Sequence, residues 1–186
     1  MSAIKKITAR EILDSRGNPT IEVDFKWNCY GIPDIRRKLR VKSQLNRQTV
    51  RRMLANPEYL YHLSSRNFEL LVKHLYEGLG YKGIVTKETR DGGVDIYLAK
   101  TIDGMPHTYV VQCKHTSSRT AKIGVSVLRD LLGVIIDKSV TAGIIITNAI
   151  FSKPAISFIK KHASRLFALG MNQLLGLMRS YLEATA

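Results

Sequence analysis

The order of helix-like and strand-like segments from residue 64 onward is the feature that most limits how this chain can fold. The stretch "SSRNFELLVKHLYEGLGY" (64–81) begins with serine, carries Gly80 near its end, and spaces its apolar residues for one face of a helix. Those apolar residues are Phe68, Leu71, Val72, Leu75 and Leu79. The segment therefore predicts an amphipathic helix that stops at the glycine.

Three short strand-like runs follow this helix, with turn sequences between them. They are "KGIVTKE" (82–88), "GGVDIYLAK" (92–100) and "HTYVVQCKH" (107–115). A second amphipathic helix is expected at 123–137, a short buried strand at 142–148, and a third helix at 153–166 with proline in its first turn. The order α-β-β-β-α-β-α predicts an α/β domain over residues 64–186, with a mixed central sheet flanked by helices.

The chain carries far more basic than acidic residues. Lysine and arginine together number 29 against 15 aspartates and glutamates, which gives a formal net charge of +14. Such a surplus attracts polyanions, nucleic acid first and anionic membrane surfaces second. The plainer alternative is a merely basic protein, but in a chain of this size the charge favours nucleic-acid binding.

Composition also bears on the compartment. Hydrophobic residues make up 45% of the chain, and no apolar run approaches the roughly 20 residues needed to cross a bilayer. The start "MSAIKKITAR" lacks the apolar stretch of a secretory signal. Cys29 and Cys113 are far apart and lack metal-ligand partners at useful spacing, which argues against a disulfide framework or a zinc site. We expect a soluble cytoplasmic protein with no membrane partner.

Residues 1–25 have a pattern of their own. "DSRGNP" supplies turn chemistry and "TIEVDF" alternates apolar and polar residues, so the segment predicts a strand, a turn and a second strand. "AREILDSRGNPTIEVD" closely resembles the amino terminus of enolase, and the resemblance stops near Phe25. The barrel on which enolase chemistry depends does not follow, so no enolase activity is implied. We interpret 1–25 as an enolase-like fragment fused upstream of an unrelated domain, either as a hairpin or as a tail.

Residues 26–63 are interpreted as a basic, partly helical linker. Its stretch "RRKLRVKSQLNRQTVRR" (36–52) holds eight basic residues and no acid. "SQLNRQTVRRML" is compatible with a helix that Asn56-Pro57 would end. The basic run is either a solvated face or an arm that contacts phosphate groups, and both interpretations stay open.

Polar residues interrupt two of the expected strands at positions that call for an explanation. Asp95 is flanked by apolar residues in "GGVDIYL", while Gln112 and Lys114 lie two apart in "VVQCKH" and so point to the same face of their strand. The short turn between these strands predicts that they are antiparallel neighbours, which would let the three side chains converge. Since a buried charge without partners costs several kcal/mol, such a cluster needs a function or mutual neutralisation.

Phosphodiester hydrolysis would give the cluster a function. That reaction uses a hard cation held by oxygen ligands, which activates water and neutralises developing charge. Asp95 would supply a carboxylate, Gln112 a side-chain carbonyl, and the backbone carbonyl of Cys113 a third oxygen. Lys114 would orient the attacking water and stabilise the charged transition state. Taken singly, Asp95 is better explained by bonds to backbone amides, and Lys114 by a side chain that extends to water. Together, at this spacing and behind "DGG", they favour the catalytic interpretation.

The segments "FELLVKHLYEGLGY", "RDGGVDIYLA", "YVVQCKH" and "GIIITNAIFSKPA" together resemble the catalytic domain of Mrr-type restriction endonucleases, within the PD-(D/E)XK nuclease superfamily. The resemblance runs from about residue 54 to residue 182, with every motif in order. It implies the restriction-endonuclease-like α-β-β-β-α-β core, and it matches Asp95 to the catalytic aspartate and Gln112 and Lys114 to the Gln-x-Lys signature. Glu69 matches a glutamate on the first helix, although a plainly solvated helix position is equally compatible.

This resemblance implies Mg²⁺-dependent (or Mn²⁺-dependent) cleavage of double-stranded DNA, often of foreign or modified DNA, by a homodimer or a higher oligomer. Two alternatives remain: a DNA-binding module whose nuclease site is inactive, and a structure-specific nuclease such as a junction resolvase. For His115 a surface role is favoured over a substrate contact, and Arg90 is read first as a turn residue. The candidate DNA contacts are Arg36, Arg37, Lys38, Arg40, Arg51, Arg52, Arg90, His115 and Lys122, together with the helix expected near 122–137.

Overall fold

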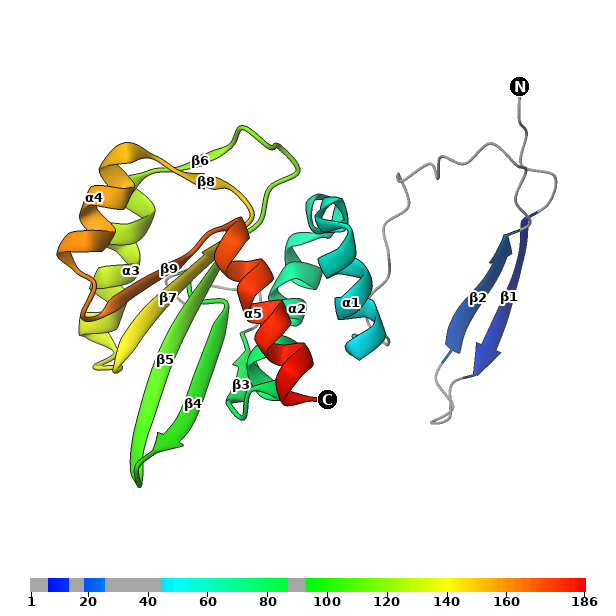
Figure 1. Cartoon of the computed structure of the whole chain (residues 1–186), viewed down its shortest axis with the longest axis horizontal. Coiled ribbons are helices and arrows are strands. Elements are labelled where there is room, and N and C mark those ends of the chain that lie inside the picture. Colours follow the sequence, from blue (N-terminus) through cyan, green and yellow to red (C-terminus); the bar gives the residue numbers. More distant parts are fainter. Residues whose placement is uncertain (1–6, 14–18, 26–44, 87–92) are drawn as a thin grey trace. The chain divides into compact units, whose positions relative to one another are not determined.

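The computed structural model describes residues 7–13, 19–25, 45–86 and 93–186, and the chain divides into two compact units, Met1–Arg37 and Lys38–Ala186 (Figure 1). The first unit contains two antiparallel strands, β1 (Ile7–Leu13) and β2 (Pro19–Phe25), with Ile7 opposite Phe25. The strand-turn-strand prediction for residues 1–25 is therefore confirmed for its two strands.

The second unit opens with helix α1 (Arg47–Ala55). The Asn46 side chain caps this helix by accepting a 2.9 Å hydrogen bond from the backbone N–H of Thr49. The helix ends at Asn56, as predicted, and the 3₁₀ segment η2 (Pro57–His62) follows. Arg47 ties α1 to the carboxyl-terminal helix α5 (Met171–Ala184), because its Nη2 donates to the carbonyl of Leu182 at 2.8 Å.

Helix α2 (Ser65–Gly78) begins at the serine cap that the sequence indicates, since the Ser64 hydroxyl accepts from the N–H of Asn67. Its predicted apolar stripe is buried, with Phe68, Leu71, Val72 and Leu75 all fully inaccessible to solvent. Gly80 then reverses the chain with a φ of +84°, a backbone conformation that glycine adopts without steric cost.

A mixed five-stranded sheet forms the centre of this unit, in the spatial order β3-β4-β5-β7-β9. The strands β3 (Lys82–Val85), β4 (Ile96–Ile102) and β5 (Met105–Lys114) are antiparallel neighbours, which confirms the pairing predicted for β4 and β5. β7 (Ala142–Thr147) pairs with β5 in parallel, and β9 (Leu166–Leu169) pairs with β7 in parallel. All six residues of β7 are buried, which is the pattern of a parallel strand covered on both faces.

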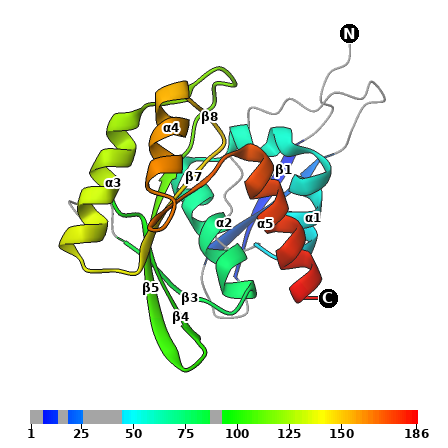
Figure 2. The same cartoon turned by 60° about the vertical axis from the view of Figure 1, so that its left-hand side comes forward.

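Helices cover the two faces of the sheet in separate groups (Figures 1 and 2). On one side α1, α2 and α5 bury the larger apolar cluster, with Phe68, Leu174 and Val111 among its members. On the other side α3 (Val125–Asp137) and α4 (Lys153–Lys161) bury a second cluster around Leu128 and Ile145. The α/β prediction with a mixed sheet between helices is thus confirmed.

Several boundaries differ from the sequence predictions. The expected helix at 153–166 ends at Lys161, and Leu166 instead starts strand β9. The helix expected from residue 123 begins at Val125, because residues 122 and 123 form a short strand, β6 (Lys122–Ile123), paired with β8 (Ile150–Phe151). The sequence analysis did not anticipate β6, β8, β9 or α5. Within the described ranges, no helix combines the length and the apolar character that a membrane span requires.

Candidate active site

Asp95 lies at the point where the chain enters β4, and its contacts are with the neighbouring strand β5. Its backbone N–H donates to the carbonyl of Val111 at 2.9 Å. Its carboxylate oxygen Oδ2 accepts a 2.6 Å hydrogen bond from the backbone N–H of Cys113. Asp95 is therefore fixed on either side of Gln112 along β5, which is the juxtaposition that the antiparallel pairing predicts.

Burial and the neighbouring charges have opposite effects on the pKa of the Asp95 carboxyl. Burial raises the pKa of Asp95, while the N–H of Cys113 and the charges of Lys114 and Arg66 act in the opposite direction and offset it only in part. The ionised carboxylate thus retains an uncompensated desolvation cost in the protein alone. A bound divalent cation would compensate that cost.

Gln112 is buried, with 6% of its surface exposed, and its side-chain oxygen Oε1 has no hydrogen-bond partner among the described residues. The other end of the amide lies against Gly93: a Cβ placed on this glycine would come within 2.7 Å of Gln112 Nε2. An unsatisfied buried carbonyl costs about 1–3 kcal/mol, so its persistence indicates a missing partner. A hard cation such as Mg²⁺ is a fitting partner for an amide oxygen beside a carboxylate.

The donor set is nevertheless sparse. In the parts of the chain that the structure describes, no three histidine, cysteine, aspartate or glutamate side chains are grouped so that they could hold a metal ion. A metal ion at Asp95 and Gln112 would therefore need water, phosphate or backbone oxygens as its remaining ligands. The backbone carbonyl of Cys113 remains a predicted third ligand.

Lys114 ends β5 and is half-buried, close enough to Asp95 for its charge to lower the pKa of that carboxyl. The backbone around it is held by two buried polar residues, Thr147 at the end of the neighbouring strand β7 and Asn148 directly after it. The hydroxyl of Thr147 donates to the carbonyl of Lys114. Asn148 binds both backbone groups of Thr116, accepting from its N–H at 2.9 Å and donating to its carbonyl at 2.7 Å.

The sequence analysis missed the roles of Thr147 and Asn148. The available signal was two polar residues placed directly after the continuous apolar run "AGIII", where a buried strand ends. Polar groups at that position are buried and must be satisfied, which here happens through the backbone that leaves the candidate site.

Glu69 projects from α2 and is not a solvated helix residue, because only 14% of its side chain is exposed. Its Oε2 pairs with Arg66 Nη1 at 2.8 Å. Burial raises the pKa of the Cys113 thiol, and the negative charges of Asp95 and Glu69 raise it further. Both carboxylates therefore act on the same end of β5 from two different elements.

Comparison with known proteins identifies the family of this domain. Residues 60–178, more than half of the chain, match the model of the Mrr catalytic domain, described as restriction endonuclease. The chain belongs to this restriction endonuclease family. The resemblance expected for residues 54–182 is thereby confirmed.

Relatives of this restriction endonuclease domain are longer proteins. An uncharacterized protein, y4cE of Sinorhizobium fredii (strain NBRC 101917 / NGR234), is 27% identical over 155 residues, which cover 82% of this chain and 39% of that protein. The chain therefore spans about two fifths of the length of that relative. A separate, short match is to enolase. The enolase of Mycoplasmopsis synoviae (strain 53) is 79% identical over 31 residues, which are 17% of this chain and 7% of that enolase.

Solved structures support the fold of the restriction endonuclease domain. The DNA modification-dependent restriction endonuclease AspBHI superposes with a TM-score of 0.53 at 18% identity, over 77% of this chain and 39% of that one. The MspJI restriction endonuclease, solved with a 27-mer oligonucleotide, gives a TM-score of 0.51 at 16% identity, over 74% of this chain and 35% of its own. At these identities the likeness concerns the fold.

Three of the arginines and lysines expected to contact DNA are described by the structure, and all three are exposed. Arg51 and Arg52 are exposed on α1, and Lys122 is exposed on β6 rather than on a helix. The remaining arginines and lysine of the expected set lie outside the described residues; they are Arg36, Arg37, Lys38, Arg40 and Arg90.

His115, for which a surface role was favoured, directly follows β5 and is partly exposed, and its contact with DNA stays a prediction. Its Nε2 lies 2.9 Å from the carbonyl of Leu60, and its ring packs on Phe68 at 5.4 Å between centroids. Burial lowers the pKa of His115, although its bond to Leu60 opposes this shift. His115 therefore links the end of β5 to η2 through one ring nitrogen and to α2 through its packing on Phe68.

Proposed function

We propose that this restriction endonuclease domain hydrolyses phosphodiester bonds of double-stranded DNA with Mg²⁺ or Mn²⁺ as cofactor. The observation that carries the proposal is the attachment of Asp95 to β5 on either side of a buried Gln112, whose amide oxygen has no hydrogen-bond partner in the described part of the chain. In a restriction endonuclease family, a carboxylate and a free carbonyl at this place are the oxygen ligands that a hard cation requires.

Each residue then has a stated task. Asp95 and the amide oxygen of Gln112 hold the divalent ion, assisted by the Cys113 carbonyl and by Glu69. When bound, that ion supplies Lewis-acid activation of water and neutralises charge on the phosphate. Lys114 orients the attacking water by hydrogen bonding and stabilises the negative charge that develops on the phosphate oxygens. The Thr147 contact and the Asn148 clamp keep the backbone of Lys114 and Thr116 in place during the reaction.

Modified DNA is the substrate class that we favour. AspBHI is described as DNA modification-dependent, and the structural match to it covers 77% of this chain. Two such domains must act to cut both strands, so we also infer a homodimer or a higher assembly on DNA. A neighbouring recognition module would select the site, since the catalytic fold occupies only about two fifths of the longer proteins it resembles.

A plasmid cleavage assay tests the proposal. Modified and unmodified plasmids are incubated with the protein in Mg²⁺ or in EDTA. We expect cleavage in Mg²⁺ alone, and a loss of at least about 100-fold in Asp95→Ala and Lys114→Ala, which is the usual scale for removing one member of a catalytic set. Glu183→Ala and Lys138→Ala, at two exposed positions outside the candidate DNA contacts, are matched controls and should cut like the wild type.

The alternatives give different outcomes in the same assay. DNA binding by the wild type with no cleavage of any plasmid would favour a binding module with an inactive site. Cleavage confined to branched substrates would favour a junction-resolving nuclease. Cutting that persists in EDTA or in Asp95→Ala would refute the proposed site.

A further inference from the structure

The two acidic residues of the candidate site, Glu69 and Asp95, come from different elements, and a single side chain links their surroundings. Arg66 lies in the first turn of α2. Its Nη1 donates to Glu69 Oε2 at 2.8 Å and to the backbone carbonyl of Thr86 at 2.9 Å. Arg66 thus joins the start of α2 to the residue that follows β3.

Thr86 continues the connection to Asp95. Its backbone N–H donates to the carbonyl of Asp95 at 2.9 Å, and its hydroxyl donates to the carbonyl of Val94 at 2.8 Å. A continuous series of hydrogen bonds therefore runs from Glu69 through Arg66 and Thr86 to the backbone of Asp95. The two carboxylates are held relative to each other by this series as well as by the general packing of the domain.

Helix stability alone does not account for the position of Arg66. A positive charge in the first turn opposes the helix macrodipole, and the first turn of α2 contains no acidic residue to offset it. The pair with Glu69 at i,i+3 contributes little to helix stability, because the Arg66 side chain is 39% exposed and water screens the pair. The contact that distinguishes Arg66 from an ordinary surface arginine is the one to Thr86.

We propose that Arg66 is a positioning residue of the nuclease site, which sets the separation between Glu69 and Asp95 through the Thr86 bridge. Its consequence for metal binding and cleavage rests on the proposed function. The bridge itself is a property of the fold and is testable without metal or DNA.

The same helix offers a matched control. Lys73 pairs with Glu77 on α2 at 2.6 Å, and no hydrogen bond that the structure describes connects this pair to Thr86 or Asp95. Arg66→Gln and Lys73→Gln each remove one cation and one intrahelical ion pair from α2. Only Arg66→Gln also removes the hydrogen bond to Thr86. A difference between the two variants therefore reports the effect of that hydrogen bond. Thermal unfolding of both variants establishes that each is folded.

The first measurement is amide hydrogen exchange of Thr86 in the full chain by NMR. We expect exchange of this N–H to become about 10-fold faster in Arg66→Gln, because its bond to Asp95 loses the clamp beside it. It should not change in Lys73→Gln. Equal exchange rates in wild type and Arg66→Gln would overturn the proposal whatever the protein does to DNA.

The second measurement is Mn²⁺ affinity of the metal-free protein, followed by electron paramagnetic resonance. Removing a nearby positive charge would by itself tighten cation binding, whereas misplacing the ligands weakens it, so the sign separates the two effects. We expect Arg66→Gln to bind Mn²⁺ about 10-fold more weakly, and its cleavage rate at saturating DNA to fall by a similar factor at unchanged DNA affinity. Tighter Mn²⁺ binding, or a loss confined to DNA affinity, would overturn the positioning role.

The two proposals fail separately. If the wild type neither binds Mn²⁺ nor cuts DNA, the proposed function is refuted, while Thr86 exchange still decides whether the bridge exists. If the wild type is active and Arg66→Gln matches it in Thr86 exchange, Mn²⁺ affinity and cleavage rate, only the role of Arg66 is refuted.

Discussion

At the scale of single residues, Gln112 is the least ordinary part of the candidate site. A neutral amide occupies a position beside Asp95 where a carboxylate would attract a cation more strongly, and its Oε1 is buried without a partner among the described residues. If the proposed site is correct, metal binding would rely more on Asp95 and on the phosphate of the substrate. The identity of residue 112 would then set the balance between the stability of the metal-free protein and its affinity for the ion.

Gln112→Glu tests that balance. A carboxylate at a position that is 6% exposed, next to Asp95, should lower the free energy of unfolding in EDTA by about 1–3 kcal/mol, because a second buried charge is left unpaired. Saturating Mg²⁺ should restore the loss, since the added ligand charge raises affinity for the ion. Chemical denaturation with and without Mg²⁺ measures both effects.

An exposed glutamine provides the control for this substitution. Gln173 lies on α5 and is exposed, so Gln173→Glu makes the same chemical change in water. Its unfolding should respond to Mg²⁺ no more than that of the wild type does. If Gln112→Glu behaves like Gln173→Glu, Gln112 is not a ligand.

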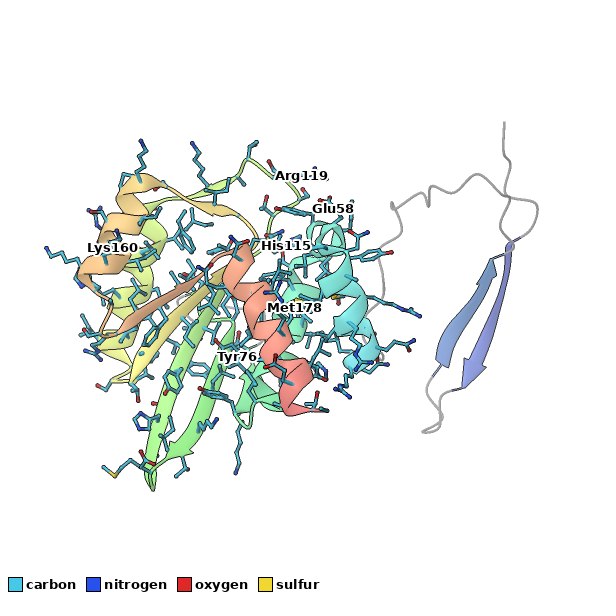
Figure 3. The ribbon with its side chains drawn as sticks, in the orientation of Figure 1. Glu58, Tyr76, His115, Arg119, Lys160 and Met178 are labelled. Carbon is cyan, nitrogen blue, oxygen red and sulfur yellow. The ribbon has the colours of Figure 1, made fainter. Side chains whose placement is uncertain are left out.

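At the scale of elements, the loop that leaves β5 after Lys114 depends on Asn148. Asn148 is 2% exposed and satisfies both the N–H and the carbonyl of Thr116. Farther along the loop, Arg119 pairs with Glu58 of η2, and Figure 3 shows these two labelled side chains close together. The loop is thus anchored at both ends while its basic side chain stays exposed.

Asn148→Ala should release this loop. Two backbone groups of Thr116 would lose their partners, at a cost of about 1–3 kcal/mol in the free energy of unfolding. Because Arg119 lies within the loop, trypsin should then cleave after it several-fold faster than in the wild type. Asn172→Ala, an exposed asparagine of α5, is the control and should change neither quantity. Unaltered proteolysis and stability in Asn148→Ala would show that the clamp is dispensable.

Some helices and strands could be predicted from the sequence and others could not. The helices α1 and α2 were predictable because their caps and apolar stripes are local features. Strand β9 was not, since "LFAL" is short and becomes a strand only by pairing with β7, far away in the sequence. Of the site, the strand alternation and the turn predicted that Asp95 approaches Gln112 and Lys114. The bridge through Arg66 and Thr86 depends on side-chain conformations, which periodicity does not encode.

At the scale of the whole molecule, the net charge of +14 should dominate DNA affinity. Each phosphate that a lysine or arginine neutralises releases counterions, so the logarithm of the binding constant falls by about 0.9 per contact for each tenfold rise in salt. The exposed Arg51, Arg52, Arg119 and Lys122 of the described part alone offer several such contacts.

We therefore expect the affinity for a duplex of unmodified DNA to fall by about 10³-fold or more between 50 and 200 mM salt, the scale for six or more phosphate contacts. Fluorescence anisotropy with Asp95→Ala in EDTA measures this fall without cleavage. Arg51→Ala should reduce the salt slope by about one contact, and Lys138→Ala, at an exposed position outside the candidate DNA contacts, should leave it unchanged. An affinity that hardly varies with salt would mean that the basic charge of this chain serves something other than the DNA backbone.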